Sequence, residues 1–143
     1  MAVESDTERA IFFDSDDFAS SATFTDVSAG TSSTVKGIFD KESVESTLTA
    51  LKEAEVNESI MIDASHGNSQ KKFKQQIPVI DSICEQISDG NKNIKGVMIE
   101  SHLNEGNQKI TEKLNYGQSI TDACIDIQTT AILFEELANV IDQ

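Results

Sequence analysis

Three stretches of the chain place apolar side chains at helical spacing. The first follows Asp40, a residue type that caps helix N-termini, and the second ends at Asp89-Gly90, a typical helix stop. Pro78 falls inside the second stretch and predicts a kink or a fresh helix start there. The apolar positions that define the three helices are Val44, Leu48 and Leu51, then Phe73, Ile77, Ile80, Cys84 and Ile87, and finally Leu133, Leu137, Val140 and Ile141.

Two short apolar runs lie between these helices and predict strands. They cover residues 59–63 and 94–99, and each is rich in Ile, Met or Val and is followed by polar residues. The polar stretch 101–119 predicts a loop, so the order from residue 40 onward is helix, strand, helix, strand, loop, helix. Strands that alternate with helices favour an α/β fold with parallel strand pairing.

Residues 1–38 have a different character, so we place a domain boundary at residue 39. Small hydroxyl side chains crowd this amino-terminal arm, and its first 35 residues hold seven acidic residues against one basic residue, Arg9. Two short alternating runs, residues 22–27 and 35–39, are typical of a β-hairpin. An acidic, disordered arm is the alternative, because an isolated hairpin of this size is marginally stable.

The charge of the chain narrows the classes of partner. It holds 25 acidic and 11 basic side chains, a formal net charge of −14. This excludes the simplest nucleic-acid binders, which need clustered Lys and Arg, and disfavours binding to an anionic membrane surface. No apolar run approaches the roughly 20 residues of a membrane span.

The two cysteines, Cys84 and Cys124, lie far apart in the sequence, which indicates free thiols. Free thiols are typical of a reducing compartment, and we therefore expect a cytoplasmic protein.

Both predicted strands end in polar residues that packing does not require. His66 follows the first strand, Glu100 ends the second, and Asp122 follows the loop and could fold back over the same edge. An imidazole with two carboxylates suits Mn²⁺, Fe²⁺ or Zn²⁺. Asp63 is a candidate to orient His66 through a hydrogen bond. The competing interpretation is a set of ordinary hydrogen-bonded loop residues, which is also our interpretation of His102.

Three segments carry a resemblance to a known family: SHGNS at residues 65–69, GVMIESHLNEGNQ at 96–108 and YGQSITDACI at 116–125. With the sequence around them, residues 39–143, they resemble the carboxy-terminal part of type I 3-deoxy-7-phosphoheptulonate synthase (DAHP synthase). The resemblance implies a (β/α)₈ barrel that condenses phosphoenolpyruvate with erythrose 4-phosphate. That transferase reaction is the first step of the shikimate pathway of aromatic amino-acid biosynthesis.

The resemblance also implies one divalent metal, held by a Cys, a His, a Glu and an Asp. By their place in the three segments, the last three correspond to His66, Glu100 and Asp122. The Cys ligand, and the Arg and Lys residues that hold the substrates' phosphates, belong to an earlier part of the barrel and have no counterpart in this chain. Cys124 lies only two residues from Asp122, so we do not expect it to replace the missing ligand.

The length of the chain limits what it is expected to do. A (β/α)₈ barrel usually needs about 250 residues, so we expect a partial barrel that holds the last two βα units. Such a fragment is expected to bind its metal weakly and to be inactive alone. Its uncovered strand edges predict a homo-oligomer or a complementing polypeptide. Asp126-Ile127 replaces the Gly-Trp that the family carries after DACI, and we expect weaker packing there.

The arm suggests an alternative function. Residues 22–40 resemble, through a short alternating pattern, the small β-rich head–tail joining proteins of tailed phages. That resemblance implies a structural or interaction protein that carries an inert enzyme fragment. If both resemblances hold, the chain is a chimera joined near residues 37–42.

Overall fold

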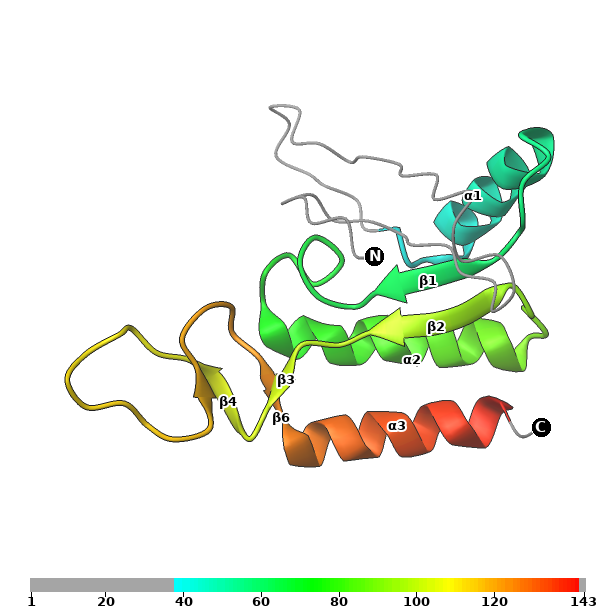
Figure 1. Cartoon of the computed structure of the whole chain (residues 1–143). Coiled ribbons are helices and arrows are strands. Elements are labelled where there is room, and N and C mark those ends of the chain that lie inside the picture. The colour runs from blue at the N-terminus through cyan, green and yellow to red at the C-terminus, as the bar shows by residue number, and fades with distance from the viewer. Residues whose placement is uncertain (1–37, 142–143) are drawn as a thin grey trace.

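The structure, a computed structural model, describes residues 38–141 (Figure 1). The possible hairpin strand at residues 22–27, and most of the one at 35–39, lie outside the described residues. The described part is a mixed helix-and-strand fold, as the α/β prediction requires. Its main elements are α1 (Lys41–Glu53), β1 (Ile60–Asp63), α2 (Gln76–Ser88), β2 (Ile94–Met98) and α3 (Ile127–Ile141).

Helix α1 begins where the sequence predicts. The side chain of Asp40 accepts a hydrogen bond from the backbone N–H of Ser43 at 3.0 Å, which satisfies one of the donors that a helix start leaves unpaired. Val44 and Leu51 are buried, and Leu48 packs against the core beside them. The apolar stripe of this helix is therefore its inner face.

Helix α2 is preceded by a short 3₁₀ helix, η1 (Phe73–Gln75). Pro78 lies in the first turn of α2, where backbone N–H groups have no partner within the helix, so its missing N–H costs no hydrogen bond. The predicted fresh helix start is confirmed. The buried face of α2 carries Val79, Ile80 and Ile83. It also carries two buried amides, Gln76 and Gln86, which were not predicted from the sequence.

Strands β1 and β2 pair in parallel, with Ile62 opposite Val97. The intervening α2 makes the crossover, and α2 and α3 lie beneath the two strands in Figure 1. The core is formed jointly by residues of α1, β1, α2, β2 and α3, with Ile125 in addition. Because the strands run in the same direction, the polar residues that follow Asp63 and Met98 emerge at one edge of the sheet.

The predicted loop at 101–119 is wrong in part, because this region contains short strands that pair in parallel. β3 (Ser101–His102) pairs with β6 (Ile125–Asp126), and β4 (Asn104–Asn107) pairs with β5 (Gln118–Ser119). Apart from Ile125, the residues of these strands are polar or Gly and show no apolar alternation, so the sequence pattern does not reveal the backbone pairing. The segment from β4 to β5 projects away from the helices (Figure 1).

Gly117 allows a close approach inside this projection. Its φ is +76°, and a Cβ at this position would lie 2.8 Å from the Cβ of Leu103. A side chain is therefore excluded both by backbone conformation and by space.

Asp126 makes a contact that was not predicted from the sequence, while the weaker packing expected at Asp126-Ile127 stays a prediction. Its Oδ1 accepts a hydrogen bond from the backbone N–H of Thr129 at 2.7 Å, so it caps α3, which begins at Ile127.

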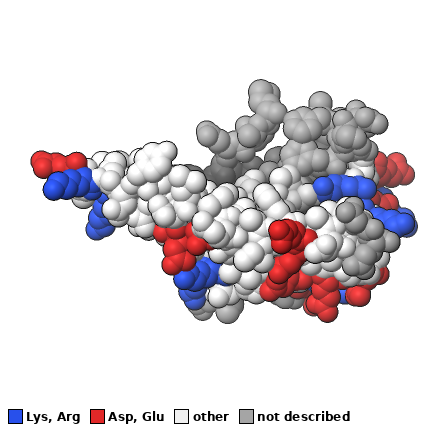
Figure 2. Space-filling view, turned by 90° about the horizontal axis from the view of Figure 1, so that it is seen from below, with Lys and Arg blue, Asp and Glu red and all other residues white. Residues whose placement is uncertain are grey.

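Helix α3 has a buried face formed by Thr130, Leu133 and Leu137. The large side chains exposed on this helix are Ile127, Ile132, Phe134 and Ile141. Figure 2 views the molecule from the side of α3 and shows wide areas with neither acidic nor basic side chains. Within residues 38–141, no helix has the length and apolar character needed to cross a membrane.

Candidate metal centre

His66 follows β1 and is held by the last residue of that strand. Its Nδ1 lies 2.8 Å from Oδ2 of Asp63, and the Oγ of Ser65 lies 2.8 Å from the same nitrogen. Asp63 is buried, and its Oδ1 accepts hydrogen bonds from both the N–H and the Oγ of Ser65. The φ of His66 is +47°, a left-handed backbone that is uncommon outside Gly. The turn after β1 thus directs Nδ1 toward Asp63 and leaves Nε2 directed away from it.

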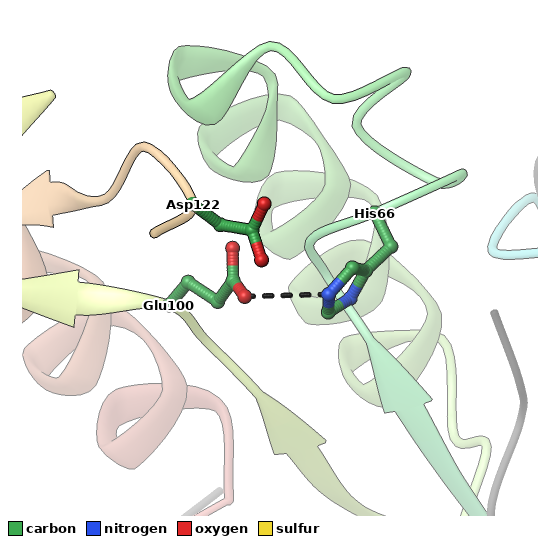
Figure 3. Close-up of side chains that lie close together, drawn as sticks. All are labelled: His66, Glu100 and Asp122. Carbon is green, nitrogen blue, oxygen red and sulfur yellow. Dashed lines mark ion pairs between the residues drawn. The ribbon is translucent and has the colours of Figure 1, made fainter. Parts of the chain in front are cut away.

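Glu100 lies beside Nε2 of His66, the ring nitrogen that does not contact Asp63. It follows β2, and its Oε1 lies 3.3 Å from Nε2 of His66 (Figure 3). Asp122 comes from the turn between β5 and β6 and is exposed. One ligand atom from each of His66, Glu100 and Asp122 lies within 4.8 Å of the others. The structure therefore brings together the three residues predicted from the sequence.

The charges in this cluster shift two of its pKa values. Burial lowers the pKa of His66, but the hydrogen bond and charge of Asp63, with the charges of Glu100 and Asp122, outweigh it, so the pKa lies above 6.5. Burial raises the pKa of Glu100, and Asp122 and Asp63 add to the rise although His66 opposes it. Carboxylates crowded around one imidazole repel one another unless a cation joins them.

Two other residues of types that can bind metals, Cys124 and His102, lie outside the three-residue group. Cys124 is buried, and its Sγ donates to the backbone oxygen of Asp122 at 3.5 Å. Burial, Glu100 and Asp122 raise the pKa of its thiol despite a hydrogen bond with Ser119, which disfavours the thiolate that binds metals. His102 is exposed, and its Nδ1 accepts from the N–H of Leu103. It takes no part in the cluster.

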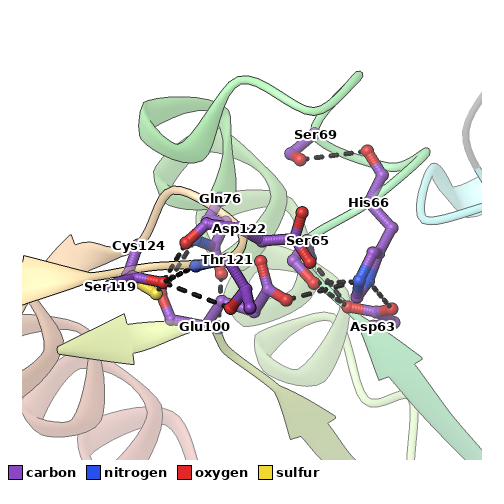
Figure 4. Close-up of polar contacts among 10 residues, drawn as sticks. All are labelled: Asp63, Ser65, His66, Ser69, Gln76, Glu100, Ser119, Thr121, Asp122 and Cys124. Carbon is purple, nitrogen blue, oxygen red and sulfur yellow. Dashed lines mark hydrogen bonds and ion pairs between the residues drawn. The ribbon is translucent and has the colours of Figure 1, made fainter. Parts of the chain in front are cut away.

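Gln76 is the polar residue of this region that was not predicted from the sequence. Its carboxamide makes two hydrogen bonds with the backbone of Glu100 (Figure 4). The helical spacing of Val79, Ile80 and Ile83 places Gln76 on the buried face of α2, which was a signal available in the sequence. Its partner was not predictable, because Glu100 lies on a different element.

Comparison with known proteins assigns the chain to a family. The model of the DAHP synthetase I family matches residues 17–135. The chain belongs to the DAHP synthetase I family. It is 51% identical over 104 residues to a "putative phospho-2-dehydro-3-deoxyheptonate aldolase" of Schizosaccharomyces pombe, a match that covers 70% of this chain and 28% of the relative. It is 50% identical over 93 residues to the Phe-sensitive phospho-2-dehydro-3-deoxyheptonate aldolase of Escherichia coli strain K12, covering 64% and 27%.

A solved structure agrees with this assignment. The phospho-2-dehydro-3-deoxyheptonate aldolase of Francisella tularensis matches with a TM-score of 0.70 and 48% identity, over 73% of this chain and 30% of that one. The chain thus spans less than a third of the length of each of these three relatives. The family match starts at residue 17, inside the arm, and these comparisons give the resemblance to phage head–tail joining proteins no support.

Proposed function

We propose that His66, Glu100 and Asp122 hold one divalent cation, and that this chain contributes the metal-binding part of a DAHP synthase-type condensation. The observation that carries this proposal is the convergence of three side chains from three separate connections between elements, with ligand atoms within 4.8 Å of one another. Small phosphorylated substrates, phosphoenolpyruvate and erythrose 4-phosphate, follow from the family. Cys84 and Cys124 are free thiols, which suits a cytoplasmic protein.

The donor set fits such an ion. An imidazole nitrogen and carboxylate oxygens are ligands of Mn²⁺, Fe²⁺ and Zn²⁺. Nε2 of His66 lies 3.3 Å from Oε1 of Glu100, so both atoms could reach one ion between them. The charges of Glu100 and Asp122 would balance the two positive charges of the ion.

Each residue then has a defined task. Oδ2 of Asp63 accepts a hydrogen bond from Nδ1–H of His66, so that the lone pair of Nε2 faces the cluster. Glu100 and Asp122 supply oxygen ligands from the other side. A metal bound here would act as a Lewis acid on the aldehyde carbonyl of the substrate and would activate water.

We further propose that residues 39–143 are part of a (β/α)₈ barrel, separate from the arm. The parallel pair β1–β2, with α2 as its crossover and the candidate ligands beyond the carboxyl ends of the strands, is the arrangement in which barrels build their sites. The Cys ligand and the phosphate-holding Arg and Lys residues that the resemblance implies would come from other polypeptide. The condensation therefore requires more than this chain.

Calorimetric titration with Mn²⁺ or Zn²⁺ tests the metal site. His66→Ala removes the imidazole nitrogen and is expected to abolish the binding signal. His102→Ala is the matched control, because this exposed histidine lies outside the cluster, and it is expected to leave most of the signal. Equal loss in both variants, or equal binding in all three proteins, would refute the site.

A further inference from the structure

Gln76 is fully buried at the first position of α2 and binds the backbone of Glu100 at two points. Its Nε2 donates to the carbonyl oxygen of Glu100 at 3.1 Å, and its Oε1 accepts from the N–H of Glu100 at 2.8 Å. One planar amide thus pairs with both polar groups of a single residue, as a neighbouring strand would.

The backbone at Glu100 needs such a partner because regular pairing stops there. The ladder between β1 and β2 ends with the bond from the N–H of Ala64 to the carbonyl of Met98, and β3 begins only at Ser101. The carbonyl of Glu100 also accepts from the N–H of Ile125 at 3.1 Å. Two hydrogen bonds to Gln76 and one to Ile125 therefore fix the peptide groups from which the side chain of Glu100 projects.

We propose that Gln76 is a positioning residue, which holds the backbone of Glu100 so that its carboxylate faces Nε2 of His66 and the carboxylate of Asp122. The inference rests on the proposed metal site. The two hydrogen bonds of the Gln76 carboxamide go to the main chain of Glu100, so Gln76 acts through the backbone of one ligand. An apolar side chain at position 76 would remove the acceptor of the Glu100 N–H and leave the Glu100 carbonyl with its bond to Ile125. Since an unpaired N–H is costly, the backbone at Glu100 would then turn toward another partner.

The chain offers a matched control on the same helix. Gln86 is also buried in α2, and its Nε2 donates to the carbonyl oxygen of Phe39 at 2.7 Å, away from the candidate ligands. Gln76→Met and Gln86→Met therefore make the same change in side chain, in the same helix, and each removes hydrogen bonds to a backbone. Both variants are expected to lower the melting temperature.

Two measurements separate positioning from general stabilisation. Calorimetric titration with Mn²⁺ is expected to give an affinity about tenfold weaker for Gln76→Met, since partners of metal ligands typically contribute 10–100-fold. For Gln86→Met the affinity is expected to stay within about twofold of wild type. Hydrogen exchange of the Glu100 amide, followed by NMR without metal, is expected to be faster in Gln76→Met alone. If Gln76→Met does not fold, Gln76→Asn, whose shorter side chain withdraws the amide from Glu100, takes its place.

Unchanged Mn²⁺ affinity in Gln76→Met, or an equal loss in both variants, would overturn the positioning role. If the wild-type chain binds no Mn²⁺, the proposed metal site fails, and the exchange measurement alone decides the role of Gln76. Equal exchange of the Glu100 amide in wild type and Gln76→Met would then refute it.

Discussion

Oδ2 of Asp63 lies 2.8 Å from Nδ1 of His66, and on the opposite side of the ring Nε2 lies 3.3 Å from Oε1 of Glu100. An ionised carboxylate only accepts hydrogen bonds, so Asp63 keeps the proton on Nδ1. The imidazole is thereby held in the tautomer whose Nε2 can bind a cation.

Asp63→Asn is expected to weaken Mn²⁺ binding by roughly tenfold, because loss of a partner that orients a metal ligand typically costs 10–100-fold. If the NH₂ group of the substituted amide donates to Nδ1 of His66, Nδ1 must be the unprotonated nitrogen. The ring proton then lies on Nε2, which has no lone pair left for a metal. Calorimetric titration measures the affinity. Asp89→Asn is the control, since this exposed carboxylate pairs with Lys41. Identical Mn²⁺ affinities in both variants would contradict a role of Asp63 in orienting His66.

Metal binding is expected to weaken as pH falls, because Nε2 of His66 must be unprotonated to act as a ligand. Burial lowers the pKa of His66, but Asp63, Glu100 and Asp122 raise it above 6.5, so the loss should begin above that value. Mn²⁺ titrations between about pH 8 and about pH 5.5 check this. A decline that begins only below pH 6.5 would contradict the influence of the carboxylates.

Asp126→Ala is expected to lower the melting temperature at neutral pH, because the cap of α3 is lost. Hydrogen bonds from Thr129 lower the pKa of Asp126 below 3.8, so its contribution is complete above the unfolded value and disappears as pH falls through the folded one. The difference between wild type and variant should therefore shrink from about pH 7 to about pH 3. Asp126→Asn, which preserves a capping oxygen, should stay close to wild type at neutral pH.

The chain alone is expected to show no DAHP synthase turnover, since the resemblance assigns a Cys ligand and the phosphate-holding residues to other parts of the barrel. A steady-state assay with phosphoenolpyruvate, erythrose 4-phosphate and Mn²⁺ measures this, with a full-length DAHP synthase as positive control. Clear turnover by homogeneous protein would mean that residues 1–143 complete a site by themselves.

Self-association is expected to grow with protein concentration. Within residues 38–141, the sheet of β1 and β2 has only these two strands, and α3 exposes Ile132, Phe134 and Ile141. Light scattering over a concentration series measures the mass. Phe134→Glu should shift the equilibrium toward monomer, whereas Glu135→Gln on the same helix should not; a wild-type monomer at every concentration would refute the prediction.

Sequence alone predicted the elements whose side chains repeat with a clear period. Val44 and Leu51, or Leu133 and Leu137, mark a helix face because burial selects apolar residues at that spacing. His66 and Glu100 were found because both follow apolar strands, and Asp122 because it follows the polar loop and also lies in the ITDAC segment of the family resemblance.

What the sequence did not reveal depends on backbone groups and on contacts between elements. The strands β3 to β6 pair through the main chain of residues that are polar or Gly except for Ile125, so they leave no apolar alternation in the sequence. The pairing of Gln76 with Glu100 joins a helix start to a strand end, and no local rule connects the two. Asp126 caps α3, a contact that was not predicted from the sequence, while the weaker packing expected at Asp126-Ile127 stays a prediction.

The parallel pairing of β1 with β2 also sets the order in which the cluster can form. Two parallel strands cannot pair through a tight turn, so the whole crossover through α2 must close first, at an entropic cost that a hairpin avoids. His66 and Glu100 stay apart until that closure, and Asp122 joins through a further segment. The shortest segment that holds two of the three donor groups runs from Glu100 to Asp122 and spans 23 residues. Binding of one cation by all three residues would therefore require this crossover to have closed first.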